Sequence, residues 1–265
     1  MGLITARKLT DVTIRIVSIG DSFTEGMNDD LPDGSFLGWA DRVAAGLATA
    51  QPEEEVFYAN LAVRGRKIVP IVTEQLDAAL ALDPPPTHLT FNGGGNDMLR
   101  PGFSDERMVA LTTRVLDRCA DKGIYVVLLT GADPTEGLPV GKRMRRLGTR
   151  FTQVIEDLVA GRDGVTFVDN LHADEGRRAA YWSEDRLHLS SLGHEWIAGR
   201  VLTAMGVPTP GPVVTDADAP RGGLAGEMRY WRAYVLPWVG RRLAGRSSGD
   251  GRSPKFPTWT RVPGA

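Results

Sequence analysis

Short apolar segments alternate along the chain with longer segments of helical periodicity. The short segments are rich in β-branched or aromatic residues and end in polar or glycine-rich turns, which is typical of buried strands. They are Ile14–Ile19, Val56–Asn60, Thr87–Asn92, Ile124–Thr130 and Val165–Val168. The helical segments are Trp39–Ala50, Ile68–Leu82, Asp105–Lys122, Lys142–Ala160 and Leu192–Ala204. This alternation predicts an α/β protein with three α/β/α layers, in which helices cover both faces of a five-stranded parallel sheet.

Right-handed crossovers make 2-1-3-4-5, the flavodoxin-like order, the simplest arrangement of these strands. Sites in such sheets lie beyond the carboxyl ends of the strands. Ser22 follows the first predicted strand, Gly65 the second and Asn96 the third. His188 comes after the fifth. We therefore expect these four residues to converge at one edge of the sheet.

The C-terminal part of the chain departs from this pattern. Val207–Pro220 is rich in Pro, Asp and Thr, as linkers are, so we expect an α/β domain over residues 1–206 and an extension over residues 207–265. An amphipathic helix over Gly226–Leu243, kinked at Pro237, is predicted by four apolar residues at helical spacing. These are Met228, Trp231, Val235 and Trp238.

The extension is also basic. From Arg221 onward nine basic residues stand against two acidic ones, so this tail carries +7 and the preceding 220 residues carry −9 of the net charge of −2. The tail could dock on the acidic body, clasp a second copy in a homodimer, or bind an anionic membrane or nucleic acid. Trp231, Trp238 and Trp259 favour burial against protein over binding to a membrane or to nucleic acid. We expect no nucleic-acid partner, and membrane contact remains the alternative.

Composition places the chain among ordinary soluble proteins. Apolar residues make up 42% and charged residues 24% of the sequence, which is typical of globular domains. The single cysteine, Cys119, excludes an intrachain disulfide and lies in a helical pattern, as a small core residue would. Met1–Asp11 contains no apolar segment of the kind found in secretory signals. We therefore expect a cytoplasmic protein.

Candidate chemistry begins at Gly20-Asp21-Ser22, directly after the first predicted strand. A serine hydroxyl becomes a nucleophile only when a neighbouring base takes its proton. Of the four histidines, His188 is the candidate base, because it follows a carboxylate, Asp185, by three positions within a turn-like segment. The carboxylate could hold one imidazole nitrogen while the other faces Ser22. Each motif alone could be an ordinary turn or a polar helix entry, but together they favour a nucleophilic serine.

Acyl transfer also needs donors for a developing oxyanion. Three candidates follow the first three strands: the N–H of Ser22, the N–H of Gly65 and the side-chain amide of Asn96. Gly93-Gly94-Gly95 could be a tight turn or a phosphate cradle, but it lacks the lysine of a P-loop and the Gly-x-Gly-x-x-Gly spacing of a dinucleotide site. Nucleotide binding is therefore not expected.

These motifs resemble the blocks of the GDSL-type lipases and esterases, the SGNH hydrolase superfamily. Over about residues 12–204, four blocks occur in the family's order: Gly20-Asp21-Ser22, Gly65, Gly94-Gly95-Asn96-Asp97 and Asp185-Arg186-Leu187-His188. The resemblance implies a three-layer α/β/α fold and hydrolysis of ester or acetyl groups without metal or cofactor. It also implies a triad of Ser22, Asp185 and His188, with Asn96 as the amide donor. Phe23 stands where the family name has Leu.

We therefore expect a serine esterase that acts on small-molecule esters, with short-chain acyl or acetyl groups, through an acyl-enzyme. A carbohydrate O-deacetylase or an acyltransferase could use the same residues. A binding module without catalytic activity on this fold is the alternative from another class. Three loops should set substrate choice: Met27–Gly38, Met98–Ser104 and Ala132–Gly141.

Overall fold

Apolar side chains lie on both faces of the central strands. In β1 (Ile14–Ile19), every residue except Arg15 is buried. Ile14 and Ile16 join the hydrophobic cluster on one face of the sheet, while Val17 and Ile19 join the cluster on the other. This is the burial expected of a strand that helices cover on both sides.

The computed structural model describes residues 13–134, 141–214, 228–237, 240 and 247–264. Five strands pair in parallel in the order β5-β4-β3-β1-β2, so the predicted order of the parallel strands is confirmed. The other four are β2 (Val56–Asn60), β3 (His88–Phe91), β4 (Tyr125–Leu129) and β5 (Val165–Val168).

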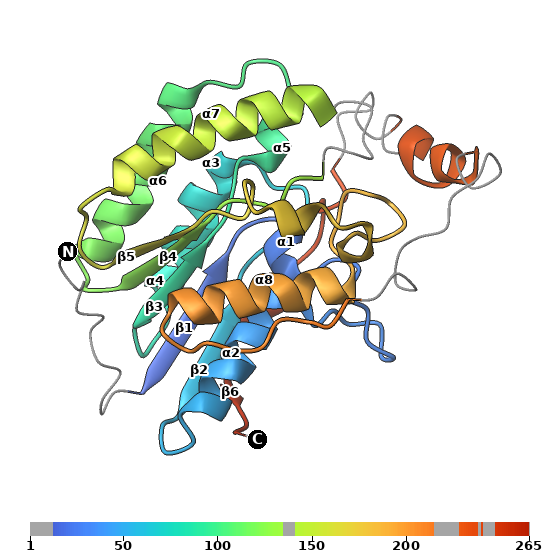
Figure 1. The fold of residues 1–265 in the computed structure, drawn as a ribbon. Coiled ribbons are helices and arrows are strands. Elements are labelled where there is room, and N and C mark those ends of the chain that lie inside the picture. The colour runs from blue at the N-terminus through green and yellow to red at the C-terminus, as the bar shows by residue number, and fades with distance from the viewer. Residues whose placement is uncertain (1–12, 135–140, 215–227, 238–239, 241–246, 265) are drawn as a thin grey trace.

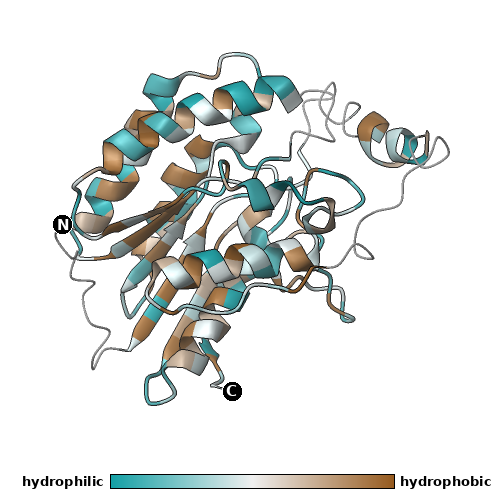
Figure 2. Cartoon of the chain, viewed as in Figure 1, coloured by the Kyte–Doolittle hydropathy of each residue, from teal (hydrophilic) through white to brown (hydrophobic). Residues whose placement is uncertain are grey.

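Helices form the outer layers of the sandwich (Figure 1). α2 (Gly38–Ala50) and α8 (Ser191–Ala204) pack on one face of the sheet. α6 (Asp105–Ala120) and α7 (Gly141–Val159) cover the other face. Figure 2 shows apolar residues gathered in the central strands and on the inner sides of the helices, with polar residues outside. Short helical elements complete the described chain: α1 (Ser22–Glu25), α5 (Gly95–Met98), η3 (Asp174–Arg177), η4 (Ala179–Tyr181) and η6 (Trp231–Val235).

The predicted helix Ile68–Leu82 is divided in the structure. It consists of α3 (Ile68–Pro70), a π-helical turn η1 (Ile71–Gln75) and α4 (Leu76–Leu80). Buried Gln75 ends the π-helical turn and bonds to the backbone at Gly20, where β1 ends. Such π-turns occur often beside functional sites.

The prediction of five strands was incomplete, because the sheet has a sixth. β6 (Phe256–Val262) pairs antiparallel with β2, with Val262 opposite Val56. None of its residues is buried, so it lacks the alternation of apolar and polar positions that reveals a half-buried strand. It also contains Pro257, which is tolerated in an edge strand.

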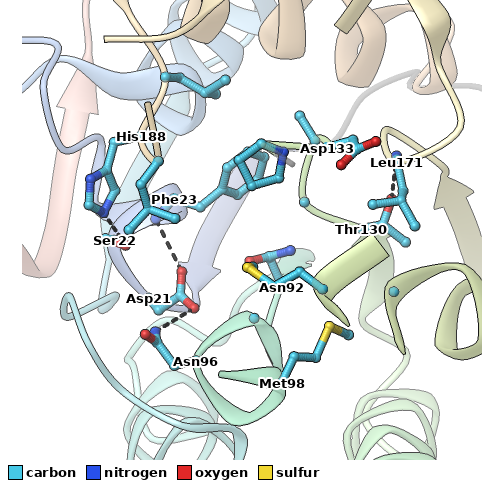
Figure 3. Close-up of a pocket in the computed structure, with 18 of the residues that line it drawn as sticks. Asp21, Ser22, Phe23, Asn92, Asn96, Met98, Thr130, Asp133, Leu171 and His188 are labelled. Carbon is cyan, nitrogen blue, oxygen red and sulfur yellow. Dashed lines mark hydrogen bonds between the residues drawn. The ribbon is translucent and has the colours of Figure 1, made fainter. Parts of the chain in front are cut away.

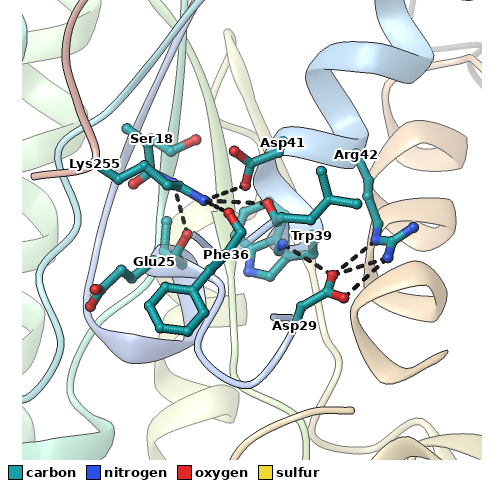
Figure 4. A network of polar contacts seen from close by, with 12 residues as sticks. Ser18, Glu25, Asp29, Phe36, Trp39, Asp41, Arg42 and Lys255 are labelled. Carbon is teal, nitrogen blue, oxygen red and sulfur yellow. Dashed lines mark hydrogen bonds and ion pairs between the residues drawn. The ribbon is translucent and has the colours of Figure 1, made fainter. Parts of the chain in front are cut away.

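β6 attaches the C-terminal extension to the chain's own α/β body. Lys255, just before β6, donates to Asp41 of α2 (2.7 Å) and to the carbonyl of Phe36 (2.9 Å) (Figure 4). Trp259 donates to the carbonyl of Pro84 (2.8 Å). Trp231, by contrast, is 46% exposed. Trp238 lies outside the described residues.

The Lys255–Asp41 pair is largely withdrawn from water, with side-chain exposures of 12% and 10%. Burial raises the pKa of Asp41 to about 7, although the charge of Lys255 opposes this shift.

Across the residues that the structure describes, no helix has both the length and the apolar character required to cross a membrane.

Replacing Lys255 with Met should leave the buried Asp41 carboxylate unpaired. We expect the free energy of unfolding at pH 8 to fall by about 3 kcal/mol, the usual cost of breaking a buried pair. The loss should be smaller at pH 6, because a protonated Asp41 needs no cationic partner. Urea titrations at the two pH values measure this.

Arg261→Ala is the matched control, because it breaks an exposed pair between β6 and Glu55 and should cost less than about 1 kcal/mol. Equal losses for the two variants would contradict the role assigned to Lys255.

Candidate active site

Ser22 occupies the turn where the chain leaves β1 and enters α1. Asp21 precedes it as the N-cap of α1, with its Oδ1 accepting the N–H of Phe23 (3.1 Å). Gln75 accepts from the N–H of Gly20 (2.8 Å) and donates to its carbonyl (3.0 Å). A Cβ at Gly20 would lie 2.8 Å from Cβ of Thr24, so only glycine fits. These bonds fix the backbone that presents Ser22.

His188 contacts both Ser22, beside which it lies in Figure 3, and Asp185. Its Nε2 is 3.0 Å from Ser22 Oγ, and its Nδ1 is 2.6 Å from Asp185 Oδ2. A carboxylate that accepts from Nδ1–H leaves Nε2 as the acceptor that faces the serine hydroxyl. This is the arrangement of a general base beside a nucleophile.

Asp185 stays ionised although it is mostly buried. Burial would raise its pKa, but this effect is outweighed by the hydrogen bond and charge of His188 and by two backbone N–H groups, those of His188 and Leu187. The pKa of Asp185 therefore lies well below its usual range. Those N–H groups donate to Asp185 Oδ1 at 2.9 and 3.0 Å. The turn thus stabilises the anion that orients His188.

Asn96 lies in α5, close to the nucleophile turn. Its Nδ2 donates to Asp21 Oδ2 (3.0 Å) and to the carbonyl of Arg66 (3.1 Å). Burial raises the pKa of Asp21 to about 6, against the opposing effects of the Phe23 N–H and the charge of His188. The two hydrogen bonds of the Asn96 amide link the segment after β3 to the segments after β1 and β2.

Gly65 is connected to the site only through its neighbour, Arg66. It precedes Arg66, whose carbonyl binds Asn96, but Gly65 itself lies outside the lining of the pocket described below. It has a positive φ of 73°, and a Cβ there would collide with Oγ of Ser247. The C-terminal extension therefore packs directly on the loop that carries Gly65.

A pocket opens beside Ser22 and extends to Asp133, in the loop that follows β4 (Figure 3). Apolar side chains dominate its lining, and they come from all three loops expected to set substrate choice as well as from α7 and the chain around His188. They include Phe23, Met27, Met98, Leu99, Ala132, Met144, Phe151, Trp182 and Leu187.

Two site residues, His194 and Asn28, were not predicted from sequence. His194, in α8, lines the pocket. Its Nε2 donates to the carbonyl of Met27 (3.1 Å), and its Nδ1 accepts the N–H of Trp39 (3.2 Å). Asn28 bonds to Asp185, as described below. Their partners lie more than 150 residues away in sequence, so spacing alone could not identify them.

Other polar residues lie apart from the site. His172 pairs with Asp169 (2.7 Å) at the surface and does not line the pocket. Arg64 is buried and pairs with Glu25 (2.6 Å).

A model of the GDSL-like lipase/acylhydrolase family matches residues 18–196. The chain belongs to this family. It is thus a serine hydrolase of carboxylic esters, and a catalytic triad with an oxyanion hole is typical of such enzymes. The match ends before the segment that contains β6. No curated protein matches the sequence.

Solved structures show the same fold at low sequence identity. The lipase Lip_vut3 from a goat rumen metagenome has a TM-score of 0.60 and 20% identity, over 74% of this chain and 99% of that one. The acetylxylan esterase Axe2 from Geobacillus stearothermophilus has a TM-score of 0.54 and 18% identity, over 73% and 94%. The esterase EstA from Pseudoalteromonas sp. has a TM-score of 0.54 and 19% identity, over 72% and 96%.

His194 should make stability fall in mild acid. Burial lowers its pKa from 6.5 to about 4, so between these values the unfolded chain binds a proton that the folded chain does not. Stability from this group is therefore complete above pH 6.5 and is lost as the pH falls towards 4. At pH 5 the loss should be about 2 kcal/mol.

His194→Gln keeps a donor and an acceptor but cannot titrate. Urea titrations measure the free energy of unfolding at pH 7 and at pH 5. The decrease between the two pH values should be about 2 kcal/mol smaller in the variant than in the wild type. Equal pH dependence in the two proteins would contradict this assignment.

Proposed function

We propose that this esterase hydrolyses esters of short apolar acyl groups through an acyl-enzyme on Ser22. One observation carries the proposal: Ser22 Oγ, the His188 ring and the Asp185 carboxylate form a continuous hydrogen-bonded chain, with separations of 3.0 and 2.6 Å. Ser22, at one end of this series of hydrogen bonds, lines the pocket, so its hydroxyl can reach a bound ester.

Ser22 Oγ attacks the ester carbonyl while His188 Nε2 takes the hydroxyl proton. Asp185 holds the ring and stabilises the imidazolium that forms. The tetrahedral intermediate then collapses, and its C–O bond to the alcohol breaks as His188 protonates the leaving oxygen. Water, deprotonated by His188, attacks the acyl-enzyme and releases the carboxylic acid and free Ser22.

Three donors would stabilise the oxyanion: the N–H groups of Ser22 and Gly65 and the side-chain amide of Asn96. Each such donor contributes about 10²–10³ in rate. Both hydrogens of Asn96 Nδ2 already bind oxygens, those of Asp21 and Arg66. The oxyanion must therefore share or replace one of these acceptors, and Asp21 holds the amide until that moment.

The apolar lining favours an apolar acyl group over a polyhydroxylated sugar. Met27, Met98 and Met144 contribute flexible side chains that can adapt to groups of different shape. Such a surface gains free energy from each methylene that it removes from water. Hydroxyl groups placed against these apolar side chains would lose their hydrogen bonds to water.

Ser22→Ala should abolish esterase activity, with a fall in kcat of at least about 10⁴-fold. The wild type, but not the variant, should gain the mass of a fluorophosphonate probe, as measured by intact-protein mass spectrometry. Ser35→Ala, at an exposed serine of the loop after α1, is the control and should keep both activity and labelling. Full activity in Ser22→Ala would refute the proposal.

Acyl length provides a second test. From p-nitrophenyl acetate to butyrate, kcat/KM should rise about tenfold, because two further methylenes contribute about 0.8 kcal/mol each. Met144→Trp, which fills the pocket from α7, should remove this gain and keep acetate turnover. Faster turnover of acetylated xylo-oligosaccharides than of p-nitrophenyl butyrate would instead favour a carbohydrate deacetylase.

A further inference from the structure

We infer that Asn28 is a positioning residue of this active site, which orients Asp185 from the loop that follows the nucleophile. The inference rests on the proposed function, because it gives Asn28 a role through the Ser22–His188–Asp185 chain. Asn28 is separated from Asp185 by 157 positions in sequence, yet their side chains bond directly.

The contact is made to the carboxylate oxygen that holds His188. Asn28 Nδ2 donates to Asp185 Oδ2 (3.0 Å), the same atom that accepts from His188 Nδ1 (2.6 Å). It also lies 2.7 Å from Oγ of Ser183, whose hydroxyl donates to Asp185 Oδ1 (2.7 Å). Asn28 therefore contacts one carboxylate oxygen directly and the other through Ser183.

The backbone at Asn28 is held in an unusual conformation that delivers this side chain. Its φ is 71°, in the left-handed region that asparagine tolerates better than most residues. On one side, the carbonyl of Met27 accepts from His194. On the other, Asp29 accepts from the N–H of Gly38 and pairs with Arg42 (Figure 4). Because both neighbours are fixed, Asn28 reaches Asp185 from a defined position.

Sharing of one oxygen has a consequence for the acid–base chemistry. The N–H from Asn28 withdraws electron density from the oxygen that stabilises the imidazolium of His188. Without this N–H, that oxygen serves His188 alone, so the imidazolium becomes more favourable and forms at higher pH. The acid limb of kcat/KM should then move to higher pH, while the less restrained carboxylate lowers kcat.

Other charged groups face this pair and remain in every variant. Asp21 and His194 interact electrostatically with His188 from the nucleophile turn and from α8. Tyr234 of the C-terminal extension interacts electrostatically with Asp185 and donates to Glu184. Because these groups are constant, a shifted acid limb reports the change at position 28.

Two substitutions separate the hydrogen bond from the backbone. Asn28→Gly accepts the left-handed conformation but has no donor. We expect kcat to fall about tenfold, the loss of one hydrogen bond to a charged group, with KM within about twofold and the acid limb moved to higher pH. Asn28→Asp keeps the shape and places a second carboxylate beside Asp185, so it should move the limb further.

Asp33→Asn, an exposed change in the same loop, is the control and should leave kcat and the limb unchanged. NMR titration of the His188 ring gives a readout that needs no turnover, and its midpoint should rise in Asn28→Gly. An unchanged midpoint, or a lower kcat with an unmoved limb, would overturn the role of Asn28. Retained activity in Ser22→Ala would instead overturn the proposed function, and the NMR midpoint would still decide whether Asn28 acts on His188.

Discussion

Parallel pairing of β1 with β2 and β3 is the constraint on which the site depends. Ser18 lies opposite Asn60, and Ile19 opposite Phe91, so all three strands end at one edge of the sheet. The segments that follow these strands meet at Asn96, after β3. Its amide nitrogen donates to Asp21, after β1, and to the carbonyl of Arg66, after β2. The buried apolar strands thus place polar groups that are far apart in sequence within hydrogen-bonding distance.

The acid–base pair is built differently, by local bonds in a turn outside the sheet. The Asp185 carboxylate accepts N–H groups of its own turn, and the N–H of Ser183 closes the turn on the carbonyl of His188 (3.0 Å). The geometry of Asp185 and His188 therefore needs little from the sheet. Contacts with Ser22 and Asn28 join this turn to the nucleophile side.

Sequence predicted the parts of the molecule that rest on local pattern. The five parallel strands and the long helices follow hydrophobic periodicity, and Ser22, Asp185, His188 and Asn96 belong to motifs; the structure brings those four side chains together. β6 was missed because its pairing with β2 depends on a contact across most of the chain and leaves no apolar alternation. His194 and Asn28 were missed for a similar reason: their roles come from partners in distant loops.

β6 also changes what counts as the folding unit of this enzyme. An unpaired strand edge offers free N–H and C=O groups to any other extended chain, and β2 would be such an edge if the protein ended with the residues matched by the family model. Asp41 would then lose Lys255, its partner in an ion pair. The complete sheet therefore needs a longer segment of the chain than residues 18–196, which match the family model. β6 covers the edge of β2 although it supplies none of the proposed catalytic residues.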